Sequence, residues 1–172
     1  FHGSVLNREL VRVALQGVDI VHHTAALVPL TKAGEKFHQV NVEGSKIIME
    51  ESAAQKIKSF IHLSSSAIFG CPTCPVDNNS SLNPVEIYGK SKLEGELVVR
   101  EIASRTGINL IAVRPRTILG QGRLGIFQIL FDWIKDNSNV YVIGNGNNKI
   151  QFLHAQDLID AYMLVCSVGK AI

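Results

Sequence analysis

The sequence predicts an α/β fold built on a doubly wound parallel sheet with helices on both faces. Two observations predict it. Short runs rich in β-branched residues alternate with longer stretches whose apolar residues recur at helical spacing. Strands of that composition, separated by helices, are typical of parallel β-α-β units with both sheet faces covered. The chain has 172 residues, of which 46% are hydrophobic, so it can bury the core of one ordinary domain.

Three short apolar runs supply the expected strands, over residues 18–24, 59–64 and 108–113. Gly17 precedes the first run, and Pro115 ends the third because proline lacks the N–H that a central strand must donate. The polar residues around them mark loops. We therefore expect three neighbouring parallel strands.

Two long amphipathic segments lie between these strands, over residues 35–55 and 87–105. Each predicts a helix, and Gly107 is a suitable stop for the second. In the first segment the apolar positions that share one helix face are Phe37, Val40, Ile47, Ile48 and Ala54.

The pattern changes after Gly120. A bulky amphipathic helix is expected over 125–135, a short strand over 140–143 and a last helix over 156–168. We divide the chain accordingly: residues 1–120 form the sheet domain, and residues 121–172 form part of a smaller region that caps it.

Charge and cysteine content exclude several classes of protein. The formal net charge is +2, which gives no long-range attraction to nucleic acid or to an anionic membrane. No apolar run is long enough to span a bilayer. Three cysteines cannot all pair within one chain, so a reducing compartment, the cytoplasm, fits better than a disulfide framework.

Tyr88 and Lys92 are the sharpest chemical signal in the sequence. They stand four residues apart near a predicted helix start, so they share one helix face. A free phenol has a pKa of about 10, and a nearby ammonium lowers such a pKa by stabilising the phenolate. The pair therefore predicts an acid–base group; the alternative is a Tyr and a Lys on an ordinary surface helix.

The ends of the predicted strands add to this signal. The second strand ends in Ser64, Ser65 and Ser66, whose hydroxyls can bond a carbonyl or alcohol oxygen. The first ends in residues 24–26, Thr-Ala-Ala, where small side chains let a flat or phosphorylated ligand approach the backbone. The third ends in residues 114–117. Carboxyl ends of parallel strands meet at one edge, where ligands bind in open α/β sheets.

Six blocks follow one another along the chain: residues 19–26 (DIVHHTAA), 41–44 (NVEG), 64–70 (SSSAIFG), 88–92 (YGKSK), 114–120 (RPRTILG), and 144–146 (GNG) leading to 152–158 (FLHAQDL). In this order they resemble the extended short-chain dehydrogenase/reductases of the NAD-dependent epimerase/dehydratase family. The resemblance implies a Rossmann-like fold and hydride transfer, with NAD or NADP, at the carbinol or carbonyl carbon of a small molecule, a nucleotide-linked sugar above all.

The resemblance also implies roles for individual residues. Tyr88 would transfer the proton, Lys92 would hold the cofactor ribose, and Ser65 would bond the reacting oxygen. The implied cofactor-binding set is Ala25, Ala26, Asn41, Ser64, Tyr88, Lys92, Pro115 and Thr117, and the implied substrate-binding set is Leu27, Ser66, Arg116 and Arg123. A homodimer through the two long helices is expected from the same resemblance.

The chain also departs from the family pattern. The glycine-rich phosphate loop and the first β-α-β unit are missing from it, so we expect part of a longer enzyme that binds cofactor weakly by itself. Ile150 and Thr117 stand where many sugar-nucleotide enzymes have arginine and asparagine. Two alternatives therefore stay open: a hydroxysteroid dehydrogenase-like or ketone-reductase enzyme, and a non-catalytic NAD(P)-binding regulator.

No metal site is predicted. Cys71 and Cys74 have C-x-x-C spacing but lack a second ligand pair, so they are interpreted as loop cysteines. His22 and His23 are adjacent on a strand and point to opposite faces, so they do not chelate one ion. His62, in the middle of a strand, is expected in the core.

Overall fold

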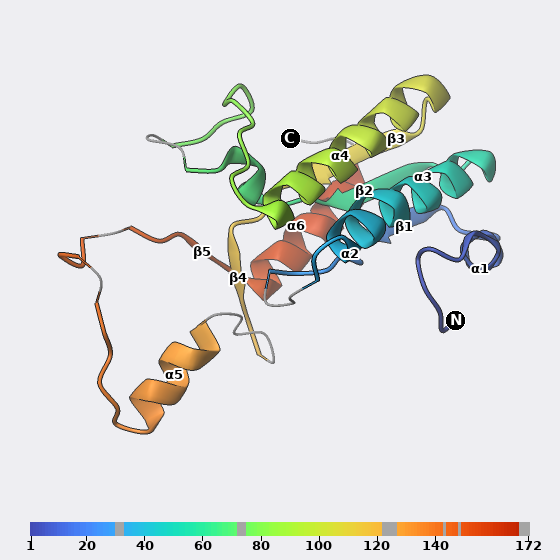
Figure 1. Ribbon diagram of the computed structural model, residues 1–172. Helices are drawn as coiled ribbons and strands as arrows, with labels where there is room; N and C mark the ends of the chain where they lie inside the picture. The colour runs from blue at the N-terminus through green and yellow to red at the C-terminus, as the bar shows by residue number, and fades with distance from the viewer. Residues whose placement is uncertain (30–32, 72–74, 122–126, 143, 148, 169–172) are drawn as a thin grey trace.

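A three-stranded parallel sheet forms the centre of the protein (Figure 1). The computed structural model describes residues 1–29, 33–71, 75–121, 127–142, 144–147 and 149–168. The strands are β1 (Ile20–His23), β2 (Ser59–Leu63) and β3 (Asn109–Val113), in the order β1-β2-β3. Each runs parallel to its neighbour, and Ser59 pairs with Ile20 on one side and Asn109 on the other. The predicted parallel α/β fold is confirmed, and the strands' carboxyl ends meet at one edge.

Helices connect these strands and cover both faces of the sheet. α3 (Ser45–Ala54) precedes β2, α4 (Ile87–Thr106) precedes β3, and α6 (Ala155–Val168) lies on the opposite face (Figure 1). The three strands lie side by side in the order in which they follow one another along the chain. The strands that the structure describes therefore do not include the point at which a doubly wound sheet reverses its strand order. The remaining elements before β3 are α1 (Arg8–Ala14), α2 (Lys36–His38), the π-helix η1 (Gln39–Gly44) and the 3₁₀ helix η2 (Ser66–Phe69).

The predicted helix over 35–55 is therefore one continuous helical segment with a π-helical turn in its middle. In a π-helix each N–H bonds the carbonyl five residues back, which adds one residue to the turn. Ser45, just after the turn, donates its hydroxyl to the Asn41 carbonyl at 2.8 Å. Asn41 itself is 1% exposed. The irregular turn thus lies inside the protein, against α4.

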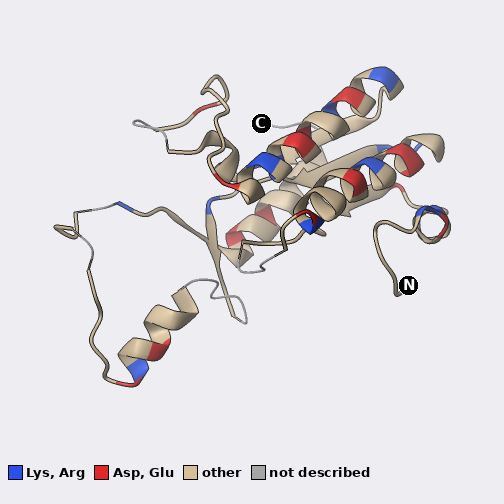
Figure 2. Ribbon diagram, in the orientation of Figure 1, with Lys and Arg blue, Asp and Glu red and all other residues tan. Residues whose placement is uncertain are grey.

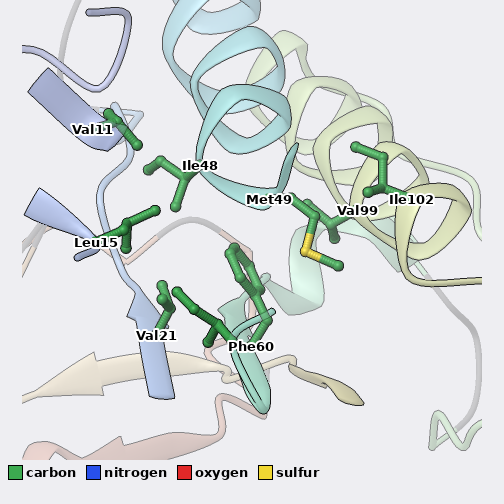
Figure 3. Close-up of a cluster of buried hydrophobic side chains, with 9 residues drawn as sticks. Val11, Leu15, Val21, Ile48, Met49, Phe60, Val99 and Ile102 are labelled. Atoms are coloured by element: carbon green, nitrogen blue, oxygen red, sulfur yellow. The ribbon is translucent and has the colours of Figure 1, made fainter. Parts of the chain in front are cut away.

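The main core lies between the sheet and helices α1, α3 and α4 (Figure 3). Phe60 of β2, Met49 of α3 and Val99 of α4 are fully buried there. Burying such a side chain contributes about 1.5–3 kcal/mol each. The other members are Val11, Leu15, Val21, Ile48, Ile57 and Ile102.

Helix α1, which the sequence pattern did not reveal, is fixed to α3 by ion pairs as well as by this core. Arg8 bonds Glu50 and Glu51, and Arg12 bonds Glu51 at 3.0 Å. Glu51 is 4% exposed, and these guanidinium hydrogen bonds, with Arg12 first, lower the pKa of its carboxyl. Acidic and basic residues also follow one another along α3 and α4 (Figure 2).

The opposite face of the sheet has a smaller core of Ile61, Ile111 and Tyr162. His22 stacks on Tyr162 with ring centroids 5.5 Å apart, whereas His23 is buried on the α3 side. The two histidines therefore point to opposite faces, as predicted. His62 is 1% exposed, which confirms that it is a core histidine.

Beyond β3 the chain forms a second, two-stranded parallel sheet of β4 (Thr117–Leu119) and β5 (Phe152–His154). α5 (Phe127–Lys135) has no buried residue and lies apart from the main sheet (Figure 1). The strand expected over 140–143 is wrong for residues 140–142, which have no pairing strand and are well exposed; residue 143 lies outside the described residues. Within the described ranges, no helix has the length and apolarity needed to cross a membrane.

Candidate active site

The carboxyl ends of β2 and β3 stay paired beyond the strands themselves. The Ser64 N–H donates to the Val113 carbonyl at 2.8 Å, and the Ser66 N–H donates to the Pro115 carbonyl at 3.0 Å. The serine run and the segment after β3 therefore lie side by side, as the sequence predicts. This edge is where an open parallel sheet binds its ligands.

Ser65 begins the short helix η2 at this edge. Its backbone is extended, and its hydroxyl oxygen accepts the Ala67 N–H at 3.2 Å, as an N-cap residue does. That bond uses an acceptor position of the hydroxyl, so the O–H remains able to donate to a bound oxygen.

The start of α4 lies directly against η2. A Cβ on Gly89 would stand 2.8 Å from the Ala67 carbonyl oxygen, so glycine at this position is what permits the approach. Tyr88, half-buried, is the second residue of α4 and packs edge-on against Phe37 with ring centroids 6.2 Å apart. The predicted acid–base group thus lies on the helix end that faces the serine turn.

Lys92 follows Tyr88 by one helical turn and is 4% exposed. Its ammonium donates to the Leu63 carbonyl at 2.6 Å, at the carboxyl end of β2. Burial lowers the Lys92 pKa to about 8, while the negative charge of Glu96 acts in the opposite direction. The same geometry that fixes the ammonium beside the serine turn therefore makes its proton easier to lose.

Two buried histidines lie below Lys92. Burial lowers the pKa of His23 to about 4, and the positive charge of Lys92 adds to that effect. Burial followed by the charge of Lys92 also lowers the pKa of His62. The His23 Nε2 lies 2.8 Å from the Ser45 hydroxyl. Both imidazoles are neutral at physiological pH, so Lys92 is the positively charged group among these three buried side chains.

Asn41 joins the end of β1 to α4. Its side-chain oxygen accepts the Leu27 N–H at 2.8 Å, and its NH₂ group donates to the Leu27 carbonyl at 3.2 Å and the Ser91 hydroxyl at 3.0 Å. The Ser91 hydroxyl in turn donates to the Tyr88 carbonyl at 2.8 Å. The amide therefore fixes the loop after Ala25 and Ala26 to the helix that bears Tyr88.

Glu96 and its partner Arg114 are the part of this region that sequence reasoning missed. The Glu96 carboxylate is 1% exposed and accepts two hydrogen bonds from Arg114, at 2.6 and 3.1 Å. Burial alone would raise its pKa, but hydrogen bonds from Arg114 and Arg100 hold it at about 2. The spacing along the helix could have revealed Glu96, because residues 88, 92 and 96 lie at successive turns on one helix face.

The other predicted site residues are distributed along the same edge. Ala25 is exposed, whereas Ala26, Leu27, Pro115 and Thr117 are half-buried. Arg116 is exposed, and its Nη1 lies 3.5 Å from the Ser66 hydroxyl. A pocket of about 190 Å³ is lined by Ala67, Gly70, Cys71, Val85, Glu86, Gly89 and Arg116.

Two predicted positions, Arg123 and Cys74, lie outside the described residues. Cys71 is exposed. Among the residues that the structure describes, no group of His, Cys, Asp and Glu could hold a metal ion.

Comparison with known proteins gives one family and many relatives. The family model described as "NAD dependent epimerase/dehydratase family" matches residues 1–171. An uncharacterized protein, y4nG, of Sinorhizobium fredii is 46% identical over 96% of the chain and 42% of its own length. A 4-hydroxy-2-methyl-3-oxo-4-farnesyl-3,4-dihydroquinoline-1-oxide ketoreductase of Stigmatella aurantiaca is 26% identical over 97% of the chain and 51% of its own length. The chain thus spans about half the length of the curated relatives it matches.

Solved structures have the same fold at low sequence identity. The UDP-glucuronic acid 4-epimerase of Bacillus cereus, in complex with UDP-glucuronic acid and NAD, superposes with a TM-score of 0.88. It is 23% identical, and the match covers 98% of this chain and 55% of that one.

Proposed function

Because the chain belongs to the NAD-dependent epimerase/dehydratase family, we propose that the protein is an NAD-dependent oxidoreductase acting on a nucleotide-linked sugar. The reacting centre is a carbinol or carbonyl carbon of that sugar. The observation that supports this most directly is the position of Lys92. Its buried ammonium lies at the carboxyl end of β2, beside the serine turn and one helical turn from Tyr88.

In this proposal three side chains act on the reacting oxygen. Tyr88 accepts or returns its proton, and Ser65 donates a hydrogen bond to it. The Lys92 ammonium holds the ribose of the cofactor and favours the phenolate of Tyr88 by its charge. NAD, when bound, supplies the hydride acceptor and donor.

The residues at the end of β1 fit such a dinucleotide. Ala25 and Ala26 have the smallest side chains after glycine, so backbone amides there are open to a ribose or diphosphate. Asn41 bonds both the N–H and the carbonyl of Leu27, so this loop is held in place before any ligand arrives. We assign Ser64, Pro115 and Thr117 to the nicotinamide side, because they stand at the ends of β2 and β3.

The pocket beside Gly89 is our candidate for the substrate. It opens between η2 and the start of α4, and Arg116 gives it a cation that can pair with a phosphate. Ser66 and Leu27 complete the described part of this set.

We further propose a homodimer through the two long helical segments, residues 35–55 and α4; on α4, Ile87 and Leu97 are 64% and 51% exposed. The division into residues 1–120 for cofactor and 121–172 for substrate, and a cytoplasmic location, are part of the same proposal.

A ketone reductase is the second candidate. Ile150 is 54% exposed and gives an apolar surface at a position where a cationic side chain would help a sugar-nucleotide enzyme to bind the diphosphate. A ketoreductase is also among the relatives, at 26% identity.

Turnover by the whole protein tests both candidates. It is to be incubated with NAD and NADP, separately, against UDP-sugars, dTDP-sugars and a panel of ketones. Tyr88→Phe should lower kcat by about 10²–10⁴-fold, the contribution typical of a general acid–base group, while cofactor binding persists. The control is Glu101→Gln, since Glu101 lies on the same helix α4 and its side chain is 69% exposed.

The outcomes separate the possibilities. Sugar-nucleotide turnover supports the first proposal, and ketone turnover alone replaces it by the second. If wild type and Tyr88→Phe bind cofactor equally and turn over equally little, the protein is a non-catalytic binder and both proposals fail.

A further inference from the structure

Glu96 stands where three parts of the proposed site meet. Its Oε1 accepts from Arg114 Nη2 at 2.6 Å and from Arg100 Nε at 2.8 Å, and its Oε2 accepts from Arg114 Nε at 3.1 Å. The carboxylate is 1% exposed, whereas the Arg114 side chain is 19% exposed. A charge buried to this degree is costly unless it is paired and hydrogen-bonded, so the arrangement fixes both side chains.

Arg114 transmits this constraint to the serine turn. Its guanidinium lies over the ring of Phe69, 5.4 Å from the centroid, and Phe69 is the last residue of η2. The backbone bonds from Ser64 to Val113 and from Ser66 to Pro115 lie on either side of Arg114. The Glu96 carboxylate therefore connects α4 with the end of β3 and with the turn that begins at Ser65.

Lys92 depends on Glu96 in a second way. In the part of the chain that the structure describes, Lys92 has no ion-pair partner within 4.0 Å, and its one bond goes to the Leu63 carbonyl. Glu96 lies one helical turn further along α4 and is the negative charge that favours the Lys92 ammonium. The other titratable and charged groups around it are Tyr88, His62 on β2, His23 on β1, and Arg100 and Arg114 beyond Glu96.

We propose that Glu96 is a positioning residue for the reaction: through Arg114 it holds α4, with Tyr88 and Lys92, against the Ser65 turn, and it places a negative charge one helical turn from Lys92. This inference rests on the proposed function. It adds to that function a residue that touches neither substrate nor cofactor and acts through Arg114 and Lys92.

Glu96→Gln in the whole protein tests the electrostatic part. Glutamine keeps the shape and removes the charge, so Lys92 should lose its proton about one pH unit lower, the small end of the effect of a neighbouring opposite charge. The alkaline limb of the pH profile of kcat should move to lower pH by the same amount. At pH values above the limb, kcat should then be about tenfold lower than in wild type. The control is Glu101→Gln on the same helix, because the Glu101 side chain is 69% exposed and its ion pair with Arg105 is long, at 3.7 Å.

Glu96→Asp tests the positioning part. It keeps the charge but withdraws the carboxylate by one methylene, so kcat should fall about tenfold or more while the alkaline limb stays at its wild-type pH. In Glu96→Asp the alkaline limb should return to its wild-type pH while kcat stays low. A variant that has merely lost its fold does not give this combination. If Glu96→Gln does not fold, Glu96→Asp decides, and an unchanged kcat overturns the proposal.

A measurement without turnover separates this inference from the proposed function. The titration of Lys92 is to be followed by NMR of its side chain, assigned by the resonance lost in Lys92→Arg. If wild type has no turnover but the midpoint moves in Glu96→Gln, the proposed function fails and the electrostatic role of Glu96 stands. If wild type turns over and neither midpoint nor limb moves in Glu96→Gln, the proposal for Glu96 is wrong.

Discussion

Replacing Gly95 by alanine should destabilise the protein, although alanine is the better helix former. Helix propensity alone favours alanine by about 1 kcal/mol. A Cβ at Gly95, however, would stand 2.3 Å from the Asn41 carbonyl oxygen and 3.3 Å from its carbonyl carbon, where ordinary contacts begin near 3.4 Å. The obstacle is backbone rather than a movable side-chain tip, so α4 and η1 must separate by about 1 Å.

The size of the loss follows from these opposing effects. Overpacking a close contact costs about 1–3 kcal/mol, and here it also strains the Ser45 bond to the same carbonyl. Because helix propensity offsets about 1 kcal/mol of this cost and the strained hydrogen bond adds to it, we expect a net loss of about 1–2 kcal/mol in the free energy of unfolding. Denaturant unfolding measures it, with Glu94→Ala as the control, because Glu94 neighbours Gly95 but its side chain is 53% exposed. A Gly95→Ala protein that is as stable as wild type, or more stable, would refute the close approach of the two helices.

Two further predictions concern the polar layer below the site. The folded protein keeps His23 and His62 neutral, whereas the same histidines take up protons near pH 6.5 in the unfolded chain. The free energy of unfolding should therefore be highest above about pH 6.5 and should fall as the pH is lowered toward 4. The expected slope is about 1.4 kcal/mol per pH unit for each histidine. Denaturant midpoints at several pH values show this slope, and a His62→Leu slope as steep as wild type would contradict it. Asn41→Ala should cost about 1–3 kcal/mol and weaken cofactor binding, because the Leu27 backbone and Ser91 lose their buried partner. Unfolding and cofactor titration measure both effects, and a variant equal to wild type in both would show that the Leu27 loop does not need the amide.

The sequence predicted the central strands well because strong hydrophobic periodicity marked them. It also placed Ser65, Tyr88 and the end of β3 at one edge, since parallel strands leave no other arrangement. It did not predict β4 and β5, which have three residues each and pair across more than thirty residues of chain. The apolar run 140–142 looked more like a strand, but a strand needs a neighbour, and periodicity contains no information about neighbours.

The candidate site shows the same limit at the level of single side chains. Tyr88 and Lys92 could be paired from spacing because both stand on one helix. The partner of Glu96 could not be predicted from spacing. Arg114 lies 18 residues further along the chain and comes close to Glu96 only when β3 joins the sheet. The π-helical turn was also hidden, because its residues are those of an ordinary amphipathic helix.

That turn has a consequence for how the chain tolerates insertions and deletions. One residue corresponds to a rotation of about 100° around an α-helix, so the extra residue in Gln39–Gly44 sets the angle between the faces before and after it. Phe37 before the turn and Met49 after it are both buried, at 7% and 0% exposed. Removing one residue from the turn would leave a regular helix with every hydrogen bond made, yet one of its two halves would face solvent with its apolar side. In this segment the number of residues is therefore constrained as strictly as their identity.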